Sequence, residues 1–186
     1  GSADFAVPDG SATIVCLPQD AYELQEVSAA SGYALAAGTT TTVVGSYNTY
    51  TSPATVTVEN KPLAVLLEKV DALDKSPLAN VSFRITDANG DCLHFTLQED
   101  GTYHVTNTGE DCFQTDINGK ASILYIPVGT YTLEEQQYPG FAPTGSQELT
   151  VTSENTVDYP LQIGVENWPL YLKVAKTDKL NGEALE

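Results

Sequence analysis

Three residue types that can react with one another recur in this chain at a nearly constant spacing. The pairs lie 107 or 109 residues apart and are Glu26 and Glu135, Asn60 and Asn167, and Lys69 and Lys176. An amine, a carboxamide and a carboxyl group are the partners needed to form an amide bond, with the carboxyl relaying the proton. From the pattern alone an ordinary alternative stays open, since lysine and glutamate usually face solvent.

The same spacing relates whole segments and defines a repeat of about a hundred residues. Residues 9–26 match residues 118–135, and the segments around Asn60 and Lys69 recur around Asn167 and Lys176. A unit of this length should carry its own core. The positions of the matching segments divide the chain into three predicted parts. Residues 1–61 are the second half of one repeat, residues 62–168 are a complete domain, and residues 169–186 are the first strand of a following repeat.

Short β-branched or alternating segments fill the complete unit, and turn signals such as Asn118-Gly119 separate them. No long stretch has the apolar spacing of an amphipathic helix, so we predict an all-β fold. The expected strands are residues 64–71, 81–87, 92–97, 102–107, 121–126, 130–136, 147–152 and 156–165.

Four motifs of the complete unit resemble those of a known family. They are Lys69-Val-Asp71, Asn118-Gly119, Pro127-Val-Gly-Thr-Tyr131-Thr-Leu-Glu-Glu135 and Asn167. In this order they resemble the B-type (CnaB) domains of collagen adhesins and the related SpaA-like prealbumin domains of Gram-positive pilins. The resemblance implies an Ig-like or prealbumin-like β-sandwich, with one complete repeat flanked by partial repeats.

The resemblance also implies an autocatalytic isopeptide bond inside the domain. Lys69 would supply the amine, Asn167 the acyl group, and Glu135 would shuttle the proton. Burial would remove the proton from Lys69 and would favour a protonated Glu135 that polarises the carboxamide and helps to expel ammonia. Folding places the reactants, so the reaction would be intramolecular and single-turnover.

The partial repeats hold the equivalent residues separately. Glu26 and Asn60 lie in residues 1–61 without a preceding lysine, and Lys176 lies in residues 169–186 without an acceptor. Asn60 and Lys176 are therefore candidates for a cross-link between chains by strand addition.

The choice of Glu135 over Glu134 rests on strand parity. Glu135 shares parity with Tyr131 and Leu133, the expected inward set. Its counterpart Glu26 is also a glutamate, whereas Glu134 is replaced by Gln25 in the other repeat. Lys69 could instead form an ordinary ion pair with one of its acidic neighbours, Asp71 or Glu68.

Composition excludes several partners. Eight basic and 25 acidic residues give a net charge of −17, which disfavours contact with nucleic acid or anionic membranes. No apolar run approaches the roughly 18 residues of a membrane span. The three cysteines, Cys16, Cys92 and Cys112, are too scattered for a zinc site, and both free thiols and a Cys92–Cys112 disulfide stay open. We expect no metal and no cofactor.

Two weaker metal-binding signals favour structural roles. Asp87-Ala-Asn89-Gly-Asp91 resembles the start of a calcium loop, but Gln98 stands where a bidentate glutamate is needed, so we expect a turn. His94 and His104 have no accompanying ligand set.

These observations predict a stalk or shaft segment of an adhesin or pilus-like protein on the Gram-positive cell wall, and not an enzyme. Its partners would be neighbouring repeats of the same protein. The alternative is a module that binds host matrix such as collagen, or glycan, through aromatic residues such as Tyr47, Tyr50 or Tyr138.

Overall fold

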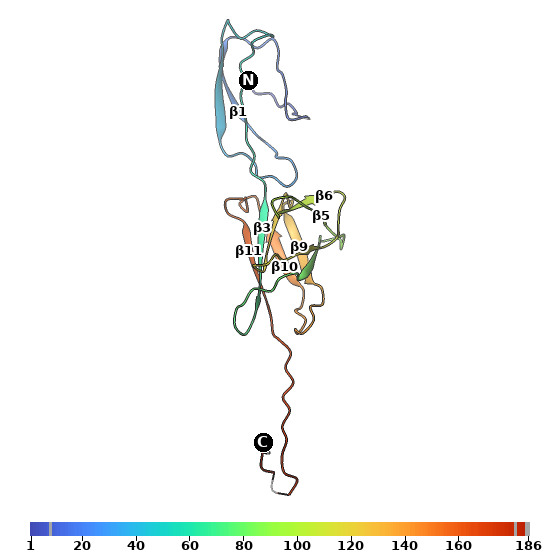
Figure 1. The fold of residues 1–186 in the computed structure, drawn as a ribbon. Helices are drawn as coiled ribbons and strands as arrows, with labels where there is room; N and C mark the ends of the chain where they lie inside the picture. The colour runs from blue at the N-terminus through green and yellow to red at the C-terminus, as the bar shows by residue number, and fades with distance from the viewer. Residues whose placement is uncertain (8, 181, 185–186) are drawn as a thin grey trace. The chain divides into compact units, whose positions relative to one another are not determined.

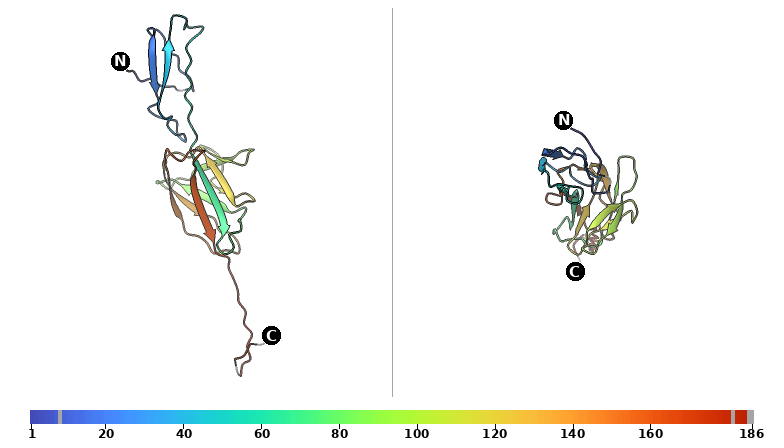
Figure 2. Two further views of the ribbon diagram at one scale, coloured as in Figure 1. Left: turned by 90° about the vertical axis from the view of Figure 1, so that its left-hand side faces the viewer. Right: turned by 90° about the horizontal axis from the view of Figure 1, so that it is seen from above.

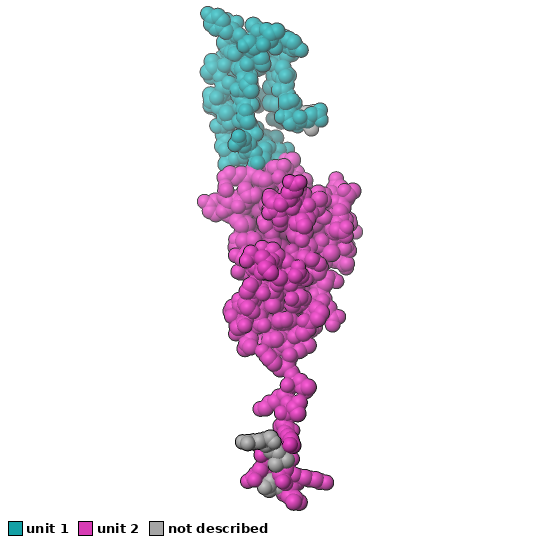
Figure 3. Space-filling model, viewed as in Figure 1, with its two compact units in different colours: residues 1–29, 35–60 teal, residues 30–34, 61–186 magenta. Residues whose placement is uncertain are grey.

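Strands, turns and extended segments make up the described chain, in which no helix occurs. The computed structural model describes residues 1–7, 9–180 and 182–184, with strands β1 to β11 (Figure 1). The chain divides into two compact units (Figure 3). Unit 1 comprises residues 1–29 and 35–60, and unit 2 comprises residues 30–34 and 61–186. Among these residues no helix has the length and apolarity that crossing a membrane requires. The predicted all-β class is confirmed.

Unit 2 is a sandwich of two sheets. The five-stranded sheet has the order β11-β3-β8-β6-β5, formed by Leu161–Asn167, Ala64–Asp71, Lys120–Leu124, Tyr103–Thr106 and His94–Leu97. The four-stranded sheet has the order β10-β9-β4-β7, formed by Gln147–Val151, Gly129–Glu135, Ser82–Thr86 and Phe113–Gln114. Both sheets have one face in the core, which explains the alternation of apolar and polar residues along their strands.

The strands β3 and β11 run parallel and lie side by side (Figure 2). Their register pairs Val165 with Lys69 and Asn167 with Asp71. Most other strand pairs of unit 2 are antiparallel, and β6 and β8 form a second parallel pair. The β3–β11 pairing therefore brings residues about a hundred positions apart in the sequence into one ladder.

The structure corrects the bounds of one predicted strand and adds a short one. We expected a strand at residues 156–165, but β11 begins at Leu161. The preceding residues form turns, in which the Asn155 N–H donates to the Thr152 carbonyl and the Tyr159 N–H to the Thr156 carbonyl. Strand β7 has only two residues, too few for an alternating pattern to reveal it.

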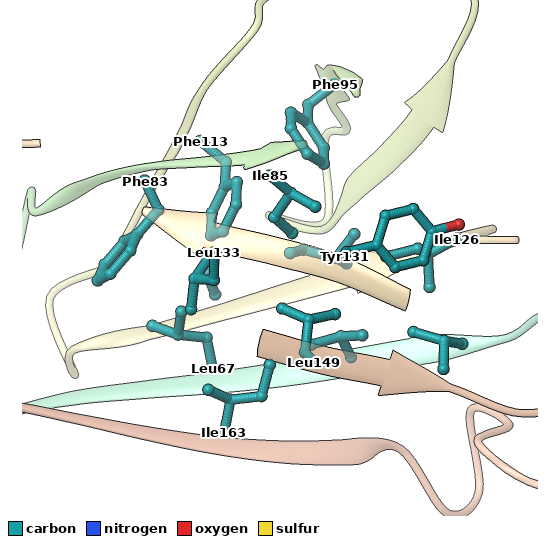
Figure 4. Close-up of a cluster of buried hydrophobic side chains, with 14 of the residues drawn as sticks. Leu67, Phe83, Ile85, Phe95, Phe113, Ile126, Tyr131, Leu133, Leu149 and Ile163 are labelled. Atoms are coloured by element: carbon teal, nitrogen blue, oxygen red, sulfur yellow. The ribbon is translucent and has the colours of Figure 1, made fainter. Parts of the chain in front are cut away.

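Apolar side chains from the two sheets meet between them and form the core (Figure 4). The ring of Phe113 lies 5.8 Å from that of Phe83 and 5.1 Å from that of Phe95, measured between centroids. Burying each large apolar side chain contributes roughly 1.5–3 kcal/mol. The core is thus built by the inward residues of both sheets.

The described residues of unit 1 contain one antiparallel strand pair. Strand β1, Asp20–Gln25, pairs with β2, Thr39–Val44, so that Asp20 faces Val44 and Gln25 faces Thr39. Residues 53–60, which align with β11 of unit 2, form no strand.

The turn after β3 is repeated near the C-terminus. The Asp71 N–H donates to the Ser76 carbonyl, and the Asp71 Oδ1 accepts the Leu73 N–H at 2.7 Å. Asp178 makes the same two bonds with Glu183 and Leu180, the latter also at 2.7 Å. The sequence repeat is therefore also a repeat of local structure. The assignment of residues 169–186 to a following domain stays a prediction.

Candidate cross-linking site

On three strands, the row of inward-facing side chains ends with a polar residue, and these three polar residues lie together at one end of the core. Because side chains alternate along a strand, each polar residue continues an apolar set on its own strand. The sets are Val65, Leu67 and Lys69 in β3, Ile163, Val165 and Asn167 in β11, and Tyr131, Leu133 and Glu135 in β9. The Lys69 side chain is 0% exposed and that of Glu135 is 3% exposed. Asn167 is 1% exposed.

The carboxyl group of Glu135 lies between the other two side chains. Its Oε1 accepts a hydrogen bond from Asn167 Nδ2 at 2.5 Å. Its Oε2 lies 3.8 Å from Lys69 Nζ. Strand β9 belongs to one sheet, and β3 and β11 belong to the other, so the contact joins the two layers of the sandwich.

The environment of Lys69 favours its neutral form. Burial lowers the pKa of Lys69 from its ordinary value, and the nearby carboxylates of Glu135, Glu166 and Asp71 oppose this effect without reversing it. Among the described residues, the amine also contacts the Val165 carbonyl, at 3.5 Å. A lysine in these surroundings exposes a nucleophilic lone pair at a lower pH than a solvated lysine does.

The carboxamide of Asn167 presents its nitrogen to the acid. Nδ2 is the atom hydrogen-bonded to Glu135, while Oδ1 is buried and has no hydrogen-bond partner among the residues that the structure describes. In an attack on the carboxamide carbon, Nδ2 is the leaving atom. The acid therefore lies beside the atom that must be protonated before it can leave.

A tight turn fixes the backbone of Lys69. The Lys69 N–H donates to the Gly119 carbonyl at 2.7 Å, and the Leu78 N–H donates to the Lys69 carbonyl at 3.0 Å. Gly119 has a φ of +71°, and a Cβ there would lie 2.4 Å from the Lys69 carbonyl oxygen. Only glycine fits both the backbone conformation and the contact.

Thr144 is a site residue that sequence reasoning missed. Its hydroxyl donates to Glu135 Oε2 at 2.7 Å. The residue lies in the irregular segment between β9 and β10, where no alternation tells which side chains point inward.

Unit 1 has the acid and the amide of the same arrangement. Asn60 Nδ2 donates to Glu26 Oε2 at 2.6 Å, and the Ala36 backbone N–H donates to the same oxygen at 2.7 Å. Residues 1–60 include no lysine. Lys176, the remaining predicted residue, is exposed.

The other residues named from the sequence lie outside this site. All three cysteines carry free thiols, with Cys16 exposed and the other two half-buried. Asp87 Oδ1 accepts the N–H groups of Asn89 and Asp91, which makes this segment an ordinary turn. Within residues 1–7, 9–180 and 182–184, no group of three acidic, histidine or cysteine side chains could hold a metal ion.

Comparison with known proteins agrees with the fold. The family model of the SpaA prealbumin-like fold domain matches residues 64–163. This is more than half of the chain, so the chain belongs to this family. The prediction of a prealbumin-like sandwich is therefore confirmed. A comparison with curated proteins gives no match.

Solved structures with a similar fold include several pilins. The minor pilin GBS52 of Streptococcus agalactiae is 18% identical, with a TM-score of 0.50 over 90% of this chain and 67% of that one. The shaft pilin SpaA of Lactobacillus rhamnosus GG is 20% identical, with a TM-score of 0.48 over 83% of this chain and 66% of that one. The chain thus spans about two thirds of the length of each of these pilins, and it shares its fold with GBS52.

Proposed function

We propose that this chain is a shaft segment of a pilus or adhesin on a Gram-positive cell surface, and that unit 2 joins Lys69 to Asn167 covalently. The contact of one buried carboxyl group, Glu135, with both the Lys69 amine and the Asn167 carboxamide carries the proposal. Burying three polar side chains costs several kcal/mol unless they are paired with one another. Membership of the prealbumin-like family supports the shaft role.

The reaction is a condensation that needs no cofactor. The neutral Lys69 Nζ attacks the Asn167 carboxamide carbon and forms a C–N bond. Glu135 accepts a proton from Nζ and transfers a proton to Nδ2. The bond between this carbon and Nδ2 breaks, ammonia leaves, and the carboxyl group returns to its starting state.

The position of the bond suits a segment that carries mechanical load. It would tie the parallel strands β3 and β11 near their C-terminal ends. Force that enters at β3 and leaves after β11 would pass through the bond and bypass the 97 residues between them. The bond would also restrict the unfolded chain as a disulfide does, by about 4–5 kcal/mol for a loop of this length. Unlike a disulfide, it does not respond to reductants.

The proposed location is extracellular, at the cell wall, and the proposed partners are neighbouring repeats of the same protein. The net charge of −17 favours solubility and weakens contact with nucleic acid and anionic lipid. The proposed chemistry happens once per chain, so the segment acts as a structural element and not as an enzyme.

Pulling on single chains tests this function. When the chain is stretched from its two ends, the parent should show no extension from residues 70–166. The Glu135→Ala variant should unfold and release about 330 Å of additional chain. Release of that length from the parent at similar force would contradict a load-bearing cross-link.

One observation favours a second function, the binding of host matrix or glycan. Tyr47 and Tyr50 of unit 1 are 91% and 89% exposed, and exposed tyrosines are common in binding surfaces. Tyr138 is less suited, because it is half-buried and its hydroxyl donates to the Ala79 carbonyl. If the chain binds immobilised collagen or glycan, Tyr47→Ala and Tyr50→Ala should abolish that binding while the cross-link remains. Unchanged binding would exclude these tyrosines.

A further inference from the structure

The two oxygens of Glu135 have different partners. Oε1 contacts the leaving nitrogen of Asn167. Oε2 faces Lys69 at 3.8 Å and accepts the Thr144 hydroxyl at 2.7 Å. Thr144 is therefore the nearest hydrogen-bonding group to the oxygen that would take the proton from the amine.

The repeat supplies a natural comparison for this contact. Gly32-Tyr-Ala-Leu-Ala36 aligns with Gly140-Phe-Ala-Pro-Thr144. The alignment is supported by equivalent backbone bonds, since the Ala34 N–H donates to the Lys61 carbonyl and the Ala142 N–H to the Trp168 carbonyl, both at 2.8 Å. Thr144 thus stands where the other repeat has Ala36.

The two repeats offer chemically different donors at this place. Ala36 donates through its backbone N–H to Glu26 at 2.7 Å. An N–H group can only donate, so it favours a carboxylate and cannot accept a hydrogen bond from the same oxygen once that oxygen is protonated. A threonine hydroxyl can donate to a carboxylate, and after rotating it can accept from a protonated acid. Only the hydroxyl matches both protonation states that a proton shuttle must pass through.

We infer that Thr144 is a positioning residue for the cross-linking reaction. Its hydroxyl keeps the carboxyl group of Glu135 between Lys69 and Asn167 while the acid gains and loses its proton. This inference rests on the proposed cross-link and adds a residue to its mechanism. The half-buried position of Thr144 limits competition from water for the same oxygen.

Two substitutions separate the hydroxyl from the shape of the side chain. Thr144→Val keeps the branched shape without the hydroxyl, and Thr144→Ser keeps the hydroxyl. Thr130→Val serves as the control, because Thr130 is an exposed residue of β9 whose hydroxyl contacts that of Thr150. Each chain is made by cell-free synthesis with a labelled pulse, and the loss of ammonia is followed by mass spectrometry of the denatured chain.

We expect Thr144→Val to form the bond roughly 10- to 100-fold more slowly, as the loss of a hydrogen bond to a charged group implies. Thr144→Ser and Thr130→Val should react within about threefold of the parent rate, since both keep the hydroxyl at residue 144. A Val variant as fast as the parent would overturn the inference, and so would a Ser variant as slow as the Val variant.

The design also distinguishes this inference from the proposed function. A parent chain that never loses ammonia refutes the cross-link itself. Introducing Thr144→Val into an Asn167→Ala background, which cannot react, measures the effect of the substitution on folding alone. A slow Val variant whose unreactive form unfolds at the same temperature as its Thr144 parent supports the positioning role. If the unreactive Val variant unfolds at a much lower temperature than the unreactive chain with Thr144, the slow reaction reflects impaired folding, and the inference is overturned.

Discussion

The two repeats of this chain hold the same acid–amide pair, but only one of them combines it with a lysine. In unit 1 the Asn60 Nδ2 lies 2.6 Å from a carboxyl oxygen of Glu26. In unit 2 the Asn167 Nδ2 lies 2.5 Å from a carboxyl oxygen of Glu135. In unit 2 the buried Lys69 faces the same carboxyl group. In unit 1 the Ala36 backbone N–H also donates to Glu26, and residues 1–60 include no lysine.

This difference shows which part of the arrangement is architectural. The hydrogen bond between acid and amide also forms in unit 1, whose sequence includes no lysine. This bond therefore does not by itself indicate reactivity. The buried amine with its lowered pKa is what gives unit 2 a nucleophile. The comparison therefore places the amine that the proposed chemistry needs on β3.

The largest expected loss of stability comes from removing the acid of unit 2, and removing the acid of unit 1 is the comparison. Glu135→Ala should prevent the cross-link and leave Lys69 buried without its partner, which lowers the unfolding free energy of unit 2 by about 4 kcal/mol or more. Glu26→Ala should leave the unfolding of unit 2 unchanged. Differential scanning calorimetry of the two variants and the parent measures this. Equal destabilisation of unit 2 by both variants would contradict the assignment.

A smaller effect is expected at the glycine turn that fixes Lys69. Gly119→Ala places a Cβ against the Lys69 carbonyl and should lower the unfolding free energy of unit 2 by about 3 kcal/mol. The equivalent Gly10 of unit 1 has φ +74° and nothing within 4 Å of its Cβ position. Gly101→Ala, also in open space at positive φ, should cost only about 1 kcal/mol in unit 2.

Urea unfolding of the Gly119→Ala and Gly101→Ala variants compares the two sites directly. A similar loss of unfolding free energy in both variants would mean that the contact with the Lys69 carbonyl adds nothing to the cost of placing an alanine at positive φ.

Stability should depend on pH when the cross-link cannot form. In an Asn167→Ala chain, the lowered pKa of Lys69 means that the unfolded state binds more protons than the folded state. The unfolding free energy should therefore rise with pH through the lowered pKa and level off near the ordinary value of 10.5. Urea titrations across this range measure the slope. Adding Lys69→Met should reduce it, and a slope that persists would assign the effect to other groups.

The smallest effect is expected from the lysine near the C-terminus. Lys176 is exposed, and the described residues of the unit that holds Asn60 form one strand pair. Lys176→Ala should leave the loss of one ammonia, relative to the mass of its own sequence, and the single monomer band on a denaturing gel unchanged. A ladder of multimers in the parent that disappears in this variant would instead show a bond between Lys176 and Asn60 of different chains.

Residues on regular strands could be placed from the sequence, and residues in irregular segments could not. Parity on β9 predicts that Glu135 points inward and Glu134 outward, as the structure shows. Thr144 lies between two strands, where no periodicity exists. The Asn118-Gly119 turn was evident, but its packing on the Lys69 backbone depends on contacts between distant segments. Two-residue β7 was too short to predict.

Mass spectrometry of the intact parent chain, denatured and reduced, tests the central claim most directly. We predict a mass lower than that of the sequence by one ammonia, with a protease digest that yields the peptides of Lys69 and Asn167 joined together. Lys69→Ala and Glu135→Ala should both restore the full mass of their own sequences. A parent chain that has its full sequence mass would contradict the account, because the buried lysine, acid and amide would then be unreactive.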